Sequence, residues 1–480
     1  MPKVDNPSMP EPAIIVIFGV TGDLVQRKLF PALINLFGAN LLDDRTTVVG
    51  ITRQNITADE LLGKFIADNP QLDDEAVESL QGRFVIQTMD ITKSTDYELL
   101  LKTLNRIEDN SGHCMNRLYY LSIPPQVFGP IVRALGEHGL NKSCPHNKAQ
   151  TRLLIEKPFG FDLESAQDLI RDIAAYFKED QIFRIDHYLA KETVQNILSF
   201  RFSNSIFESI WDAKHIRRIE ISAIEKIGIE NRAIFYEEVG ALRDLIQSHL
   251  LQLLSVVAME EPTEMTSEAI HHSRLKLLEE VEAPARDTLA EVAFRAQYES
   301  YKSEVKNPGS TTETFAAIKL FIKSPRWDKV PIIIKTGKAL DQKNTEVRII
   351  FRQDATKKLF HNSLTFRIQP NEGIALQLYA KKPGLNNEIE PVDMDFSYDQ
   401  YFDSKSQPEA YERVLIDVMR GDHTLFATSE EVLETWRVVE PIVQSWDQDR
   451  TTIAIYEGGA SNPPDLPNWA VSEHRHTLKP

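Results

Sequence analysis

The chain has 480 residues, which favours two domains over one and allows a sizeable hydrophobic core. Its composition is that of an ordinary globular protein, with 42% apolar and 26% charged residues. Asp and Glu (71) outnumber Lys and Arg (54), and the net charge of −17 argues against nucleic acid or an anionic membrane as the main partner. Any anionic substrate must therefore meet a local group of basic side chains.

The cysteine content and the hydropathy of the chain indicate its compartment. Cys114 and Cys144 are its two cysteines, too few for a disulfide framework, so a reducing environment fits. Residues 1–12 are polar and proline-rich, without the apolar region of a signal peptide, and no run approaches the length of a membrane span. We expect a soluble, cytoplasmic protein.

The first apolar run, residues 13–18, is typical of a strand buried on both faces of a parallel sheet. Gly-Val-Thr-Gly-Asp-Leu follows at positions 19–24, and a helical pattern continues through Phe37. A strand, a glycine turn and a helix form the phosphate-binding start of a dinucleotide fold, because glycine allows close approach and the helix N-terminus favours anions. The spacing is not Gly-x-Gly-x-x-Gly, so a tight turn without a ligand is the alternative.

Further apolar runs alternate with helical or polar stretches, at residues 47–52, 84–89, 118–122 and 152–155. This alternation predicts βαβ units and a parallel sheet over residues 13 to about 185. Arg53 follows the second strand, at a position where NAD-binding folds commonly hold an acid for the ribose 2′-hydroxyl. An arginine there suits the 2′-phosphate of NADP, and a solvated surface arginine is the alternative. The fifth run leads into Glu156-Lys157-Pro158, where the proline fixes the chain direction and Lys157 reaches the crevice beyond the strand ends.

Residues 184–192 read Arg-Ile-Asp-His-Tyr-Leu-Ala-Lys-Glu, between a short apolar strand and a helical pattern. Asp186 is therefore predicted at a strand-to-helix junction, a natural place for an exposed functional carboxylate. If the helix begins near His187, then His187 and Lys191 are i,i+4 neighbours that point the same way. With Tyr188 between them, they suit an anionic group such as a phosphate. The alternative is a charged helix start that Asp186 caps.

The pattern changes after residue 185, so we predict one domain over residues 1–185 and a second over 186–480. Residues 216–224 resemble a long strand that reaches Glu225, and a helix is predicted from about Glu237 to Met259. Asp244 and His249 lie on that helix, about 140° apart at 3.6 residues per turn. His249 shares its face with Leu245, Ile246 and Leu253, so a buried core histidine is the simpler interpretation of its position.

Strands predominate from about residue 290 onward, and their alternation of apolar and polar residues predicts an antiparallel sheet. They are expected at residues 315–322, 331–335, 345–351, 364–369 and 374–380. Lys335, Lys338 and Lys343 are predicted on one turn segment, either as an anion-binding cluster or as a solvated basic loop. Two helices are expected at 408–419 and 429–443, with Trp436 as a packing residue.

Several of these elements resemble those of glucose-6-phosphate dehydrogenases, in the family's order over residues 14 to about 445. The matching stretches are Gly-x-x-Gly-Asp-Leu at 19–24, Glu-Lys-Pro at 156–158, the 184–192 stretch, Arg-Asp-x-x-Gln-Ser-His at 243–249 and Arg-Ile-Gln-Pro-Asn-Glu at 367–372. Ala190 replaces the family's glycine and Ser248 its asparagine. The Glu-Lys-Pro tripeptide also occurs in other sugar and inositol oxidoreductases.

The resemblance implies an N-terminal α/β Rossmann domain and a C-terminal α+β domain with a large, mainly antiparallel sheet. It implies oxidation of D-glucose 6-phosphate to 6-phospho-D-glucono-1,5-lactone, the entry step of the oxidative pentose phosphate pathway, with hydride transfer to NADP and NAD as a weaker alternative. A homodimer or homotetramer is expected, because the exposed face of the C-terminal sheet commonly makes a dimer in this family. No metal is expected.

The resemblance also assigns roles to residues. His249 would be the catalytic base and Asp186 the carboxylate that orients it, as suits a histidine with a near-neutral pKa. The expected cofactor-binding residues are Gly19, Thr21, Gly22, Asp23, Leu24, Arg53, Asp90, Ile91, Tyr120 and Lys157. The expected substrate-binding residues are Lys157, His187, Tyr188, Lys191, Glu225, Asp244, Lys338, Lys343 and Gln369.

Two other functions compete with this one. A Glu-Lys-Pro dehydrogenase for a non-phosphorylated sugar would leave the His187 and Lys191 pair and the lysine turn unexplained. A catalytically silent NADP-binding regulator would be expected to lack the base or the phosphate residues, and both are present in the sequence.

Overall fold

The first strand, β1 (Ala13–Phe18), is buried at every position and pairs in parallel with β2 (Thr47–Thr52) and β4 (Asn116–Leu121). A strand with parallel neighbours on both sides and helices above and below has no face for water, which is why this run is continuously apolar. The computed structural model describes residues 9–70, 72–144, 149–353, 361–402, 408–449 and 453–472.

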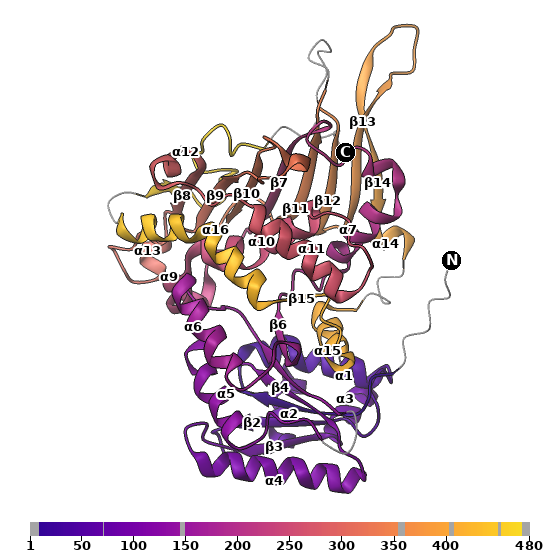
Figure 1. Cartoon of the computed structure of the whole chain (residues 1–480), viewed down its shortest axis with the longest axis vertical. Coiled ribbons are helices and arrows are strands. Elements are labelled where there is room, and N and C mark those ends of the chain that lie inside the picture. Colours follow the sequence, from indigo (N-terminus) through magenta and orange to yellow (C-terminus); the bar gives the residue numbers. More distant parts are fainter. Residues whose placement is uncertain are drawn as a thin grey trace. The chain divides into compact units, whose positions relative to one another are not determined.

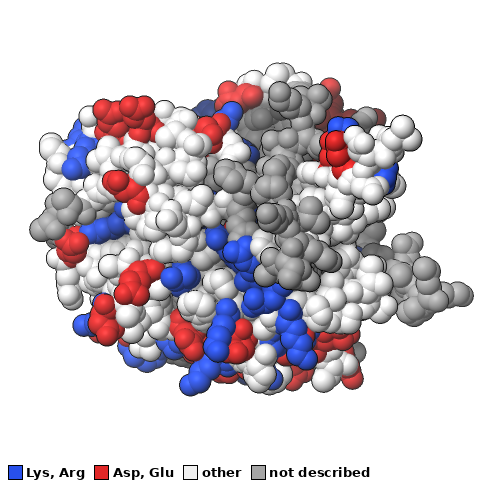
Figure 2. Space-filling model, turned by 90° about the horizontal axis from the view of Figure 1, so that it is seen from above, with Lys and Arg blue, Asp and Glu red and all other residues white. Residues whose placement is uncertain are grey.

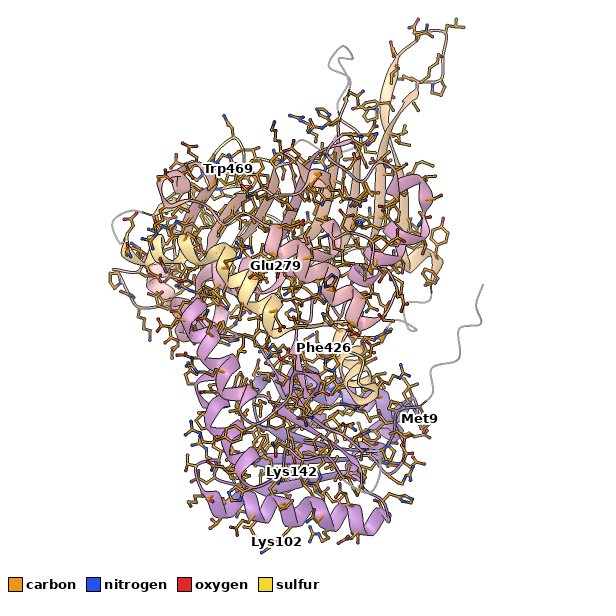
Figure 3. The ribbon with its side chains drawn as sticks, in the orientation of Figure 1. Met9, Lys102, Lys142, Glu279, Phe426 and Trp469 are labelled. Atoms are coloured by element: carbon orange, nitrogen blue, oxygen red, sulfur yellow. A yellow bond between two sulfur atoms is a disulfide. The ribbon has the colours of Figure 1, made fainter. Side chains whose placement is uncertain are left out.

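The first sheet has seven strands in the order β15-β6-β5-β4-β1-β2-β3. Its remaining strands are β3 (Phe84–Thr88), β5 (Thr151–Ile155), β6 (Ile182–Ile185) and β15 (Phe426–Ala427). All pairings within it are parallel except that of β15 with β6. Phe426, labelled in Figure 3, packs edge-on against Phe183 with the ring centroids 4.9 Å apart.

Helices separate these strands along the chain and complete the βαβ units. They are the π-helical turn η1 (Val25–Leu29), α1 (Phe30–Gly38), α2 (Ala58–Asp68), α3 (Asp74–Gln81), α4 (Ser94–Ser111), α5 (Phe128–Glu137), α6 (Leu163–Ala174) and α15 (Ala410–Arg420). The start of α2 illustrates how the sequence sets a boundary: Thr57 and Glu60 form a reciprocal capping box.

The second sheet has nine strands in the order β14-β13-β12-β11-β7-β10-β9-β8-β16. They are β7 (Ile216–Ile224), β8 (Ala293–Tyr298), β9 (Phe315–Leu320), β10 (Ile332–Gly337), β11 (Asn344–Phe351), β12 (Ser363–Gln369), β13 (Gly373–Lys381), β14 (Ile389–Ser397) and β16 (Ala454–Tyr456). The pairings are antiparallel except β7 with β10 and β8 with β16. The predicted fold class is confirmed, and Figure 1 shows the β13–β14 hairpin extending beyond the rest of this sheet.

Helices accompany the second sheet and carry several candidate residues. They are α7 (Glu192–Ser203), α8 (Ser205–Glu208), α9 (Ala233–Ala241), η5 (Leu242–Leu250), α10 (Leu251–Ala258), α11 (Ser267–Glu280), α12 (Leu289–Val292), α13 (Tyr301–Glu304), α14 (Tyr398–Tyr401) and α16 (Ser429–Gln448). Trp436 on α16 is buried, as predicted. The predicted helix from Glu237 to Met259 is in fact three segments, because Gly240 interrupts it with φ 66° and η5 is π-helical.

Contacts divide the chain into two units. The first comprises residues 1–160, 164–190 and 408–429, and the second 161–163, 191–407 and 430–480. The segment 408–429, with α15 and β15, therefore belongs with the N-terminal part of the chain. The hydrophobic core of the first unit includes Leu415 and Met419 of this segment beside Leu33 and Phe37 of α1. The sequence-based division at residue 185 assigned this segment to the C-terminal domain.

The two cysteines form one disulfide, between the loop before β4 and the loop before β5. The cysteine count did not predict this bond. Two cysteines are too few for a framework of several disulfides, but the count does not decide whether the two pair with each other. In the described part of the chain, no helix is both long and apolar enough to cross a membrane.

Candidate active site

The glycine turn after β1 is shaped by its backbone. Gly19 has φ 80°, and a Cβ atom there would lie 2.4 Å from the carbonyl oxygen of Ser122. The amides of Gly19 and Val20 both donate to the Ile51 carbonyl, at 3.1 and 3.2 Å, and the Gly22 amide donates to the Gly19 carbonyl at 2.9 Å. Only glycine fits this position. Any other residue would be strained at this positive φ, and its Cβ atom would collide with Ser122, the residue after β4.

The other predicted residues of this turn lie at or near its surface. Thr21, Gly22 and Leu24 are half-buried, and Asp23 is exposed and pairs with Arg27 at 2.8 Å. The side chains at the surface of the turn are therefore small or polar, apart from the half-buried Leu24. That surface fits a dinucleotide diphosphate, which needs close backbone approach.

Arg53 and Asp90 follow the carboxyl ends of the adjacent strands β2 and β3. Arg53 is exposed and Asp90 is half-buried. Hydrogen bonds from Thr92 lower the pKa of Asp90, and the positive charges of Lys93 and Arg53 lower it further. The Ile91 carbonyl accepts a hydrogen bond from the Tyr97 hydroxyl at 2.9 Å. Arg53 therefore follows the second strand, as the sequence predicts, and its side chain is exposed.

The end of β5 carries a half-buried carboxylate, Glu156, that sequence reasoning missed. Glu156 accepts hydrogen bonds from the hydroxyls of Tyr120 and of Tyr411, the second at 3.2 Å. Burial raises the pKa of Glu156 although both hydroxyls favour its ionised form. Lys157, the next residue, is half-buried and precedes a cis proline. Tyr120 is fully buried with its hydroxyl on Glu156, so it lies beneath the sheet end rather than on its surface.

The local sequence could have indicated only part of this group. Glu156 is visible in the Glu-Lys-Pro tripeptide, whereas Tyr411 lies 255 residues away on α15 and carries no local signal. A tyrosine from the returning segment therefore helps to hold the residue that precedes Lys157.

The stretch around Asp186 is a turn and not the start of a helix. The Asp186 side chain accepts the Tyr188 amide at 2.9 Å, its carbonyl accepts the Ala190 amide at 3.3 Å, and α7 begins only at Glu192. Lys191 is the N-cap residue, with extended φ −73° and ψ 136°. The prediction that His187 and Lys191 share one helical face is therefore wrong, because Asp186 bonds locally and closes a turn first.

Burial within this turn differs from the expected exposure. Asp186 is 3% exposed and Tyr188 9%, while His187 is half-buried with its ring 5.0 Å from that of Tyr188. Ala190 is buried and its φ is not positive, so it replaces a glycine without backbone strain. Arg184 bonds Glu179 at 2.6 Å and the Ser429 hydroxyl at 2.7 Å, which makes it a structural residue.

The segment η5 carries Asp244 and His249, and its π-helical form changes their relationship. The Leu251 amide donates to the Ile246 carbonyl, five residues back. With i→i+5 bonding, residues five apart lie about one turn apart along the same side of the helix. The predicted separation of about 140° is therefore wrong, because it assumed an α-helix. Both side chains are buried, with 3% of Asp244 and 1% of His249 exposed.

Neighbours of these two residues fix their setting. Arg232 lies 3.5 Å from the Asp244 carboxylate, and the Ser248 hydroxyl donates to the Asp244 carbonyl at 2.7 Å. Ser248 thus bonds a backbone carbonyl of its own helix. The segment η5 packs against β7 and β10 of the second sheet.

Glu225 and Lys338 follow the ends of the parallel neighbours β7 and β10 and form an ion pair. The Lys338 ammonium also lies 5.4 Å from the centre of the Tyr236 ring. Lys343 is exposed, and Gln369 is half-buried at the end of β12, before a cis proline. Two of the predicted substrate residues are therefore in direct contact.

Lys335 does not join this group. It lies within β10 rather than on a turn, is 8% exposed, and its ammonium donates to the Ser472 hydroxyl at 2.7 Å. Burial lowers its pKa. The prediction of three lysines on one turn is wrong for this residue, because Lys335-Thr336-Gly337 continues the strand.

Figure 2 shows Lys and Arg side chains grouped near the middle of one face despite the acidic composition.

Comparison with known proteins decides the family. The family model described as "Glucose-6-phosphate dehydrogenase, NAD binding domain" matches residues 16–196, and the one described as "Glucose-6-phosphate dehydrogenase, C-terminal domain" matches residues 198–477. The chain belongs to the glucose-6-phosphate dehydrogenase family. The two models together span both sheets and the stretches that carry the predicted site residues.

Relatives within the glucose-6-phosphate dehydrogenase family match over nearly the whole chain. A protein named glucose-6-phosphate 1-dehydrogenase from Chlamydia muridarum is 39% identical over 96% of this chain and 96% of its own length. A protein of the same name from Bacillus subtilis is 36% identical over 97% of this chain and 98% of its own length. A solved structure titled "Glucose-6-phosphate dehydrogenase in complex with its substrate glucose-6-phosphate" superposes with a TM-score of 0.87 at 32% identity, covering 95% of this chain and 96% of that one. The enzyme from Mycobacterium avium gives 0.82 at 34% identity with the same coverage.

Proposed function

We propose that this chain oxidises the C1 hydroxyl of D-glucose 6-phosphate to 6-phospho-D-glucono-1,5-lactone and transfers the hydride to NADP. The observation that carries this proposal is the family match over residues 16–196 and 198–477, which includes every stretch singled out from the sequence. A homodimer or homotetramer and a cytoplasmic location stay predictions.

The glycine turn after β1 fits the cofactor. Gly19 allows the turn to pack closely against the Ser122 carbonyl, and Thr21, Gly22, Asp23 and Leu24 complete the turn. When bound, NADP supplies the acceptor for the hydride that leaves C1. Arg53, exposed at the end of β2, would hold the 2′-phosphate, because a guanidinium binds phosphate oxygens with charge-assisted hydrogen bonds. Asp90 and Ile91 are proposed to line the remaining wall of the cofactor site. Tyr120, which is fully buried, is proposed to support that wall through its hydrogen bond with Glu156.

The proton of the C1 hydroxyl must leave as the hydride departs. We assign an imidazole nitrogen of His249 to accept this proton, since histidine is the usual base near neutral pH. Asp186 is assigned to orient the imidazole and to stabilise the imidazolium that forms. The hydrogen bond from the Tyr188 amide fixes one carboxylate oxygen of Asp186, which limits how far its side chain can rotate.

The remaining residues are assigned to the substrate. His187, Tyr188 and Lys191 would bind the phosphate through an imidazole, a hydroxyl and an ammonium group. Asp244, Glu225, Lys338, Lys343 and Gln369 would bind the sugar hydroxyls. Lys157 would lie between the cofactor and the substrate, because it follows a strand end at which dinucleotide folds place their ligands.

A steady-state assay of nicotinamide reduction tests the proposal. Glucose 6-phosphate should be oxidised with a kcat/KM at least about a hundredfold above that for glucose, because phosphate contacts of roughly 1.5–3 kcal/mol each are lost with glucose. Equal rates with both sugars would favour a dehydrogenase for non-phosphorylated sugars. NADP binding without turnover of either sugar would favour a silent regulator.

A further inference from the structure

The start of η5 is held by a carboxylate that none of the assignments above uses. Glu313 precedes β9 and is 4% exposed. Its side chain accepts the Leu242 amide at 2.9 Å, and its backbone carbonyl accepts the Ala241 amide at 3.0 Å. The first amides of a helix have no partner within it, and a buried helix start needs acceptors from elsewhere. Glu313 supplies two of them to the segment that carries Asp244 and His249.

Gly240 shows how closely this carboxylate sits against the helix. It has φ 66° and ψ 179°, which breaks α9 from η5 and is a conformation that is essentially restricted to glycine. A Cβ atom at Gly240 would lie 2.5 Å from a carboxylate oxygen of Glu313. The break and the carboxylate therefore require one another: the break turns the amides toward Glu313, and the missing side chain admits its carboxylate.

The residue after Glu313, Thr314, bonds to the backbone of Lys338, one of the proposed substrate residues. The Thr314 carbonyl accepts the Lys338 amide at 3.0 Å, and the Tyr456 hydroxyl donates to the Lys338 carbonyl at 2.7 Å. Thr314 is fully buried, and its hydroxyl lies 2.9 Å from that of Tyr456. Two adjacent residues thus bond to the base-bearing helix on one side and to the backbone of Lys338 on the other.

We infer that Glu313 is a positioning residue, which fixes η5 relative to the Lys338 backbone so that Asp244 and His249 meet the same sugar as the Glu225 and Lys338 pair. This inference rests on the proposed function. Glu313 acts through the helix and contacts neither the sugar nor the cofactor in this assignment. The effect on rate should be large, because a misplacement of about 1 Å can cost about a hundredfold in turnover.

The contact, rather than the charge, is expected to matter. Burial raises the pKa of Glu313, while Leu242, Arg243 and Arg295 favour its ionised form. A neutral glutamine has the same reach and still offers a carbonyl oxygen to the Leu242 amide. An aspartate keeps the carboxylate but is one methylene shorter, too short for an acceptor that must sit at 2.9 Å.

Three variants of the full-length enzyme separate these effects. Glu313→Gln should keep kcat/KM for glucose 6-phosphate within about threefold of the unmodified enzyme. Glu313→Asp and Glu313→Ala should lose about ten- to a hundredfold. NADPH affinity, followed by its fluorescence, should change by less than about threefold in all three, because the predicted cofactor residues lie in a different unit of the chain. The melting temperature of each variant is measured alongside.

Glu237→Asp is a matched control. The Glu237 carboxylate accepts hydrogen bonds from Tyr301, Asn307 and Ser310 in the segment before Glu313, at 2.8, 2.8 and 2.9 Å. Shortening it should lower the melting temperature while kcat/KM stays within about threefold. If Glu313→Ala does not fold, the comparison of Glu313→Gln with Glu313→Asp decides the matter.

Two results would overturn the inference. One is activity of Glu313→Asp equal to that of Glu237→Asp, which would make Glu313 a purely structural cap. The other is loss of activity in Glu313→Gln with retention in Glu313→Asp, which would make charge the cause. In both cases the unmodified enzyme still oxidises glucose 6-phosphate, whereas inactivity of the unmodified enzyme would remove the proposed function itself.

Discussion

Lys338 and Glu225 form an ion pair at the ends of two parallel strands, with Lys338 6% exposed. Parallel neighbours that end together bring the residues after them to one edge, which is why two positions far apart in the sequence meet. A lysine held in this way keeps its ammonium in one place, whereas an exposed lysine must lose rotamer freedom when it binds a ligand.

Lys338→Met should therefore weaken substrate binding more than Lys343→Met does. Loss of a charged contact costs roughly 1.5–3 kcal/mol, so KM for glucose 6-phosphate should rise about ten- to a hundredfold in Lys338→Met. Lys343 is exposed, and its replacement should have a smaller effect. Steady-state kinetics of both variants provides the measurement. Equal increases in KM would show that the ion pair with Glu225 confers no advantage.

His249→Asn should lower kcat by about two to four orders of magnitude with little change in substrate affinity, the usual effect of losing a general base. Ser248→Asn, which introduces the family's residue next to it, is the control and should change kcat by less than about threefold. Single-turnover kinetics and a binding isotherm for glucose 6-phosphate measure the two quantities. Near-normal turnover in His249→Asn would return this histidine to a packing role.

Arg53→Ala should raise KM for NADP much more than KM for NAD, because only NADP carries a 2′-phosphate. One charge-assisted contact contributes roughly 1.5–3 kcal/mol, or about ten- to a hundredfold in KM. Arg45→Ala is a suitable control, since Arg45 pairs with Asp43 on the surface before β2. An equal rise for both cofactors would contradict recognition of the 2′-phosphate by Arg53.

Lys191→Ala should reduce kcat/KM for glucose 6-phosphate by about ten- to a hundredfold and leave the slow oxidation of glucose almost unchanged. The expected loss comes from the ammonium group of Lys191 itself. It does not require a helical face shared with His187, since Lys191 is the extended N-cap residue of α7. Comparison of the two sugars with the same variant supplies the control. A similar loss with both would assign Lys191 to the fold or to the cofactor.

Asp417→Asn should stabilise the protein above neutral pH. Asp417 is 2% exposed on α15, and burial raises its pKa to about 6 although Arg413 pairs with it at 2.8 Å. A raised pKa means that the native state binds the proton more tightly than the unfolded state, so this stability is complete below about pH 4 and is lost as the pH rises through about 6. The asparagine cannot ionise. The unfolding free energy of the Asp417→Asn protein should therefore exceed that of the unmodified protein by about 1–3 kcal/mol at pH 8.

Thermal denaturation of both proteins at pH 4 and pH 8 measures this difference. The gain should almost vanish near pH 4, because the carboxyl is then almost fully protonated in the folded protein and about half protonated in the unfolded chain. A gain of the same size at both pH values would mean that ionisation of Asp417 is not its cause.

The sequence predicts the two sheets well, because continuous apolar runs and alternating strands report burial directly. β1, β2 and β7 begin and end as predicted. β14 was missed: it is an edge strand whose residues are exposed or half-buried, so no apolar alternation marks it. β15 has two residues and can be recognised only through its pairing with β6.

The site was less accessible to sequence reasoning, for two physical reasons. Apolar spacing over nine residues does not distinguish i→i+4 from i→i+5 bonding, so the alignment of Asp244 with His249 could not be seen. Residues with good helix propensity after Asp186 suggested a helix, yet the hydrogen bond of its carboxylate with the Tyr188 amide closes a turn first. Contacts over long sequence separations, such as Tyr411 with Glu156, leave no local pattern at all.

The return of residues 408–429 to the first unit has a consequence for synthesis on the ribosome. When residue 190 has been made, β6 still lacks its outer partner β15, and the α1 surface that α15 covers is bare. The nascent chain must therefore carry an open strand edge and an apolar patch through the synthesis of more than two hundred further residues. Such surfaces bind chaperones or associate with one another. A fragment that ends after residue 190 should for the same reason aggregate, and supplying residues 408–429 through a short linker should restore its solubility.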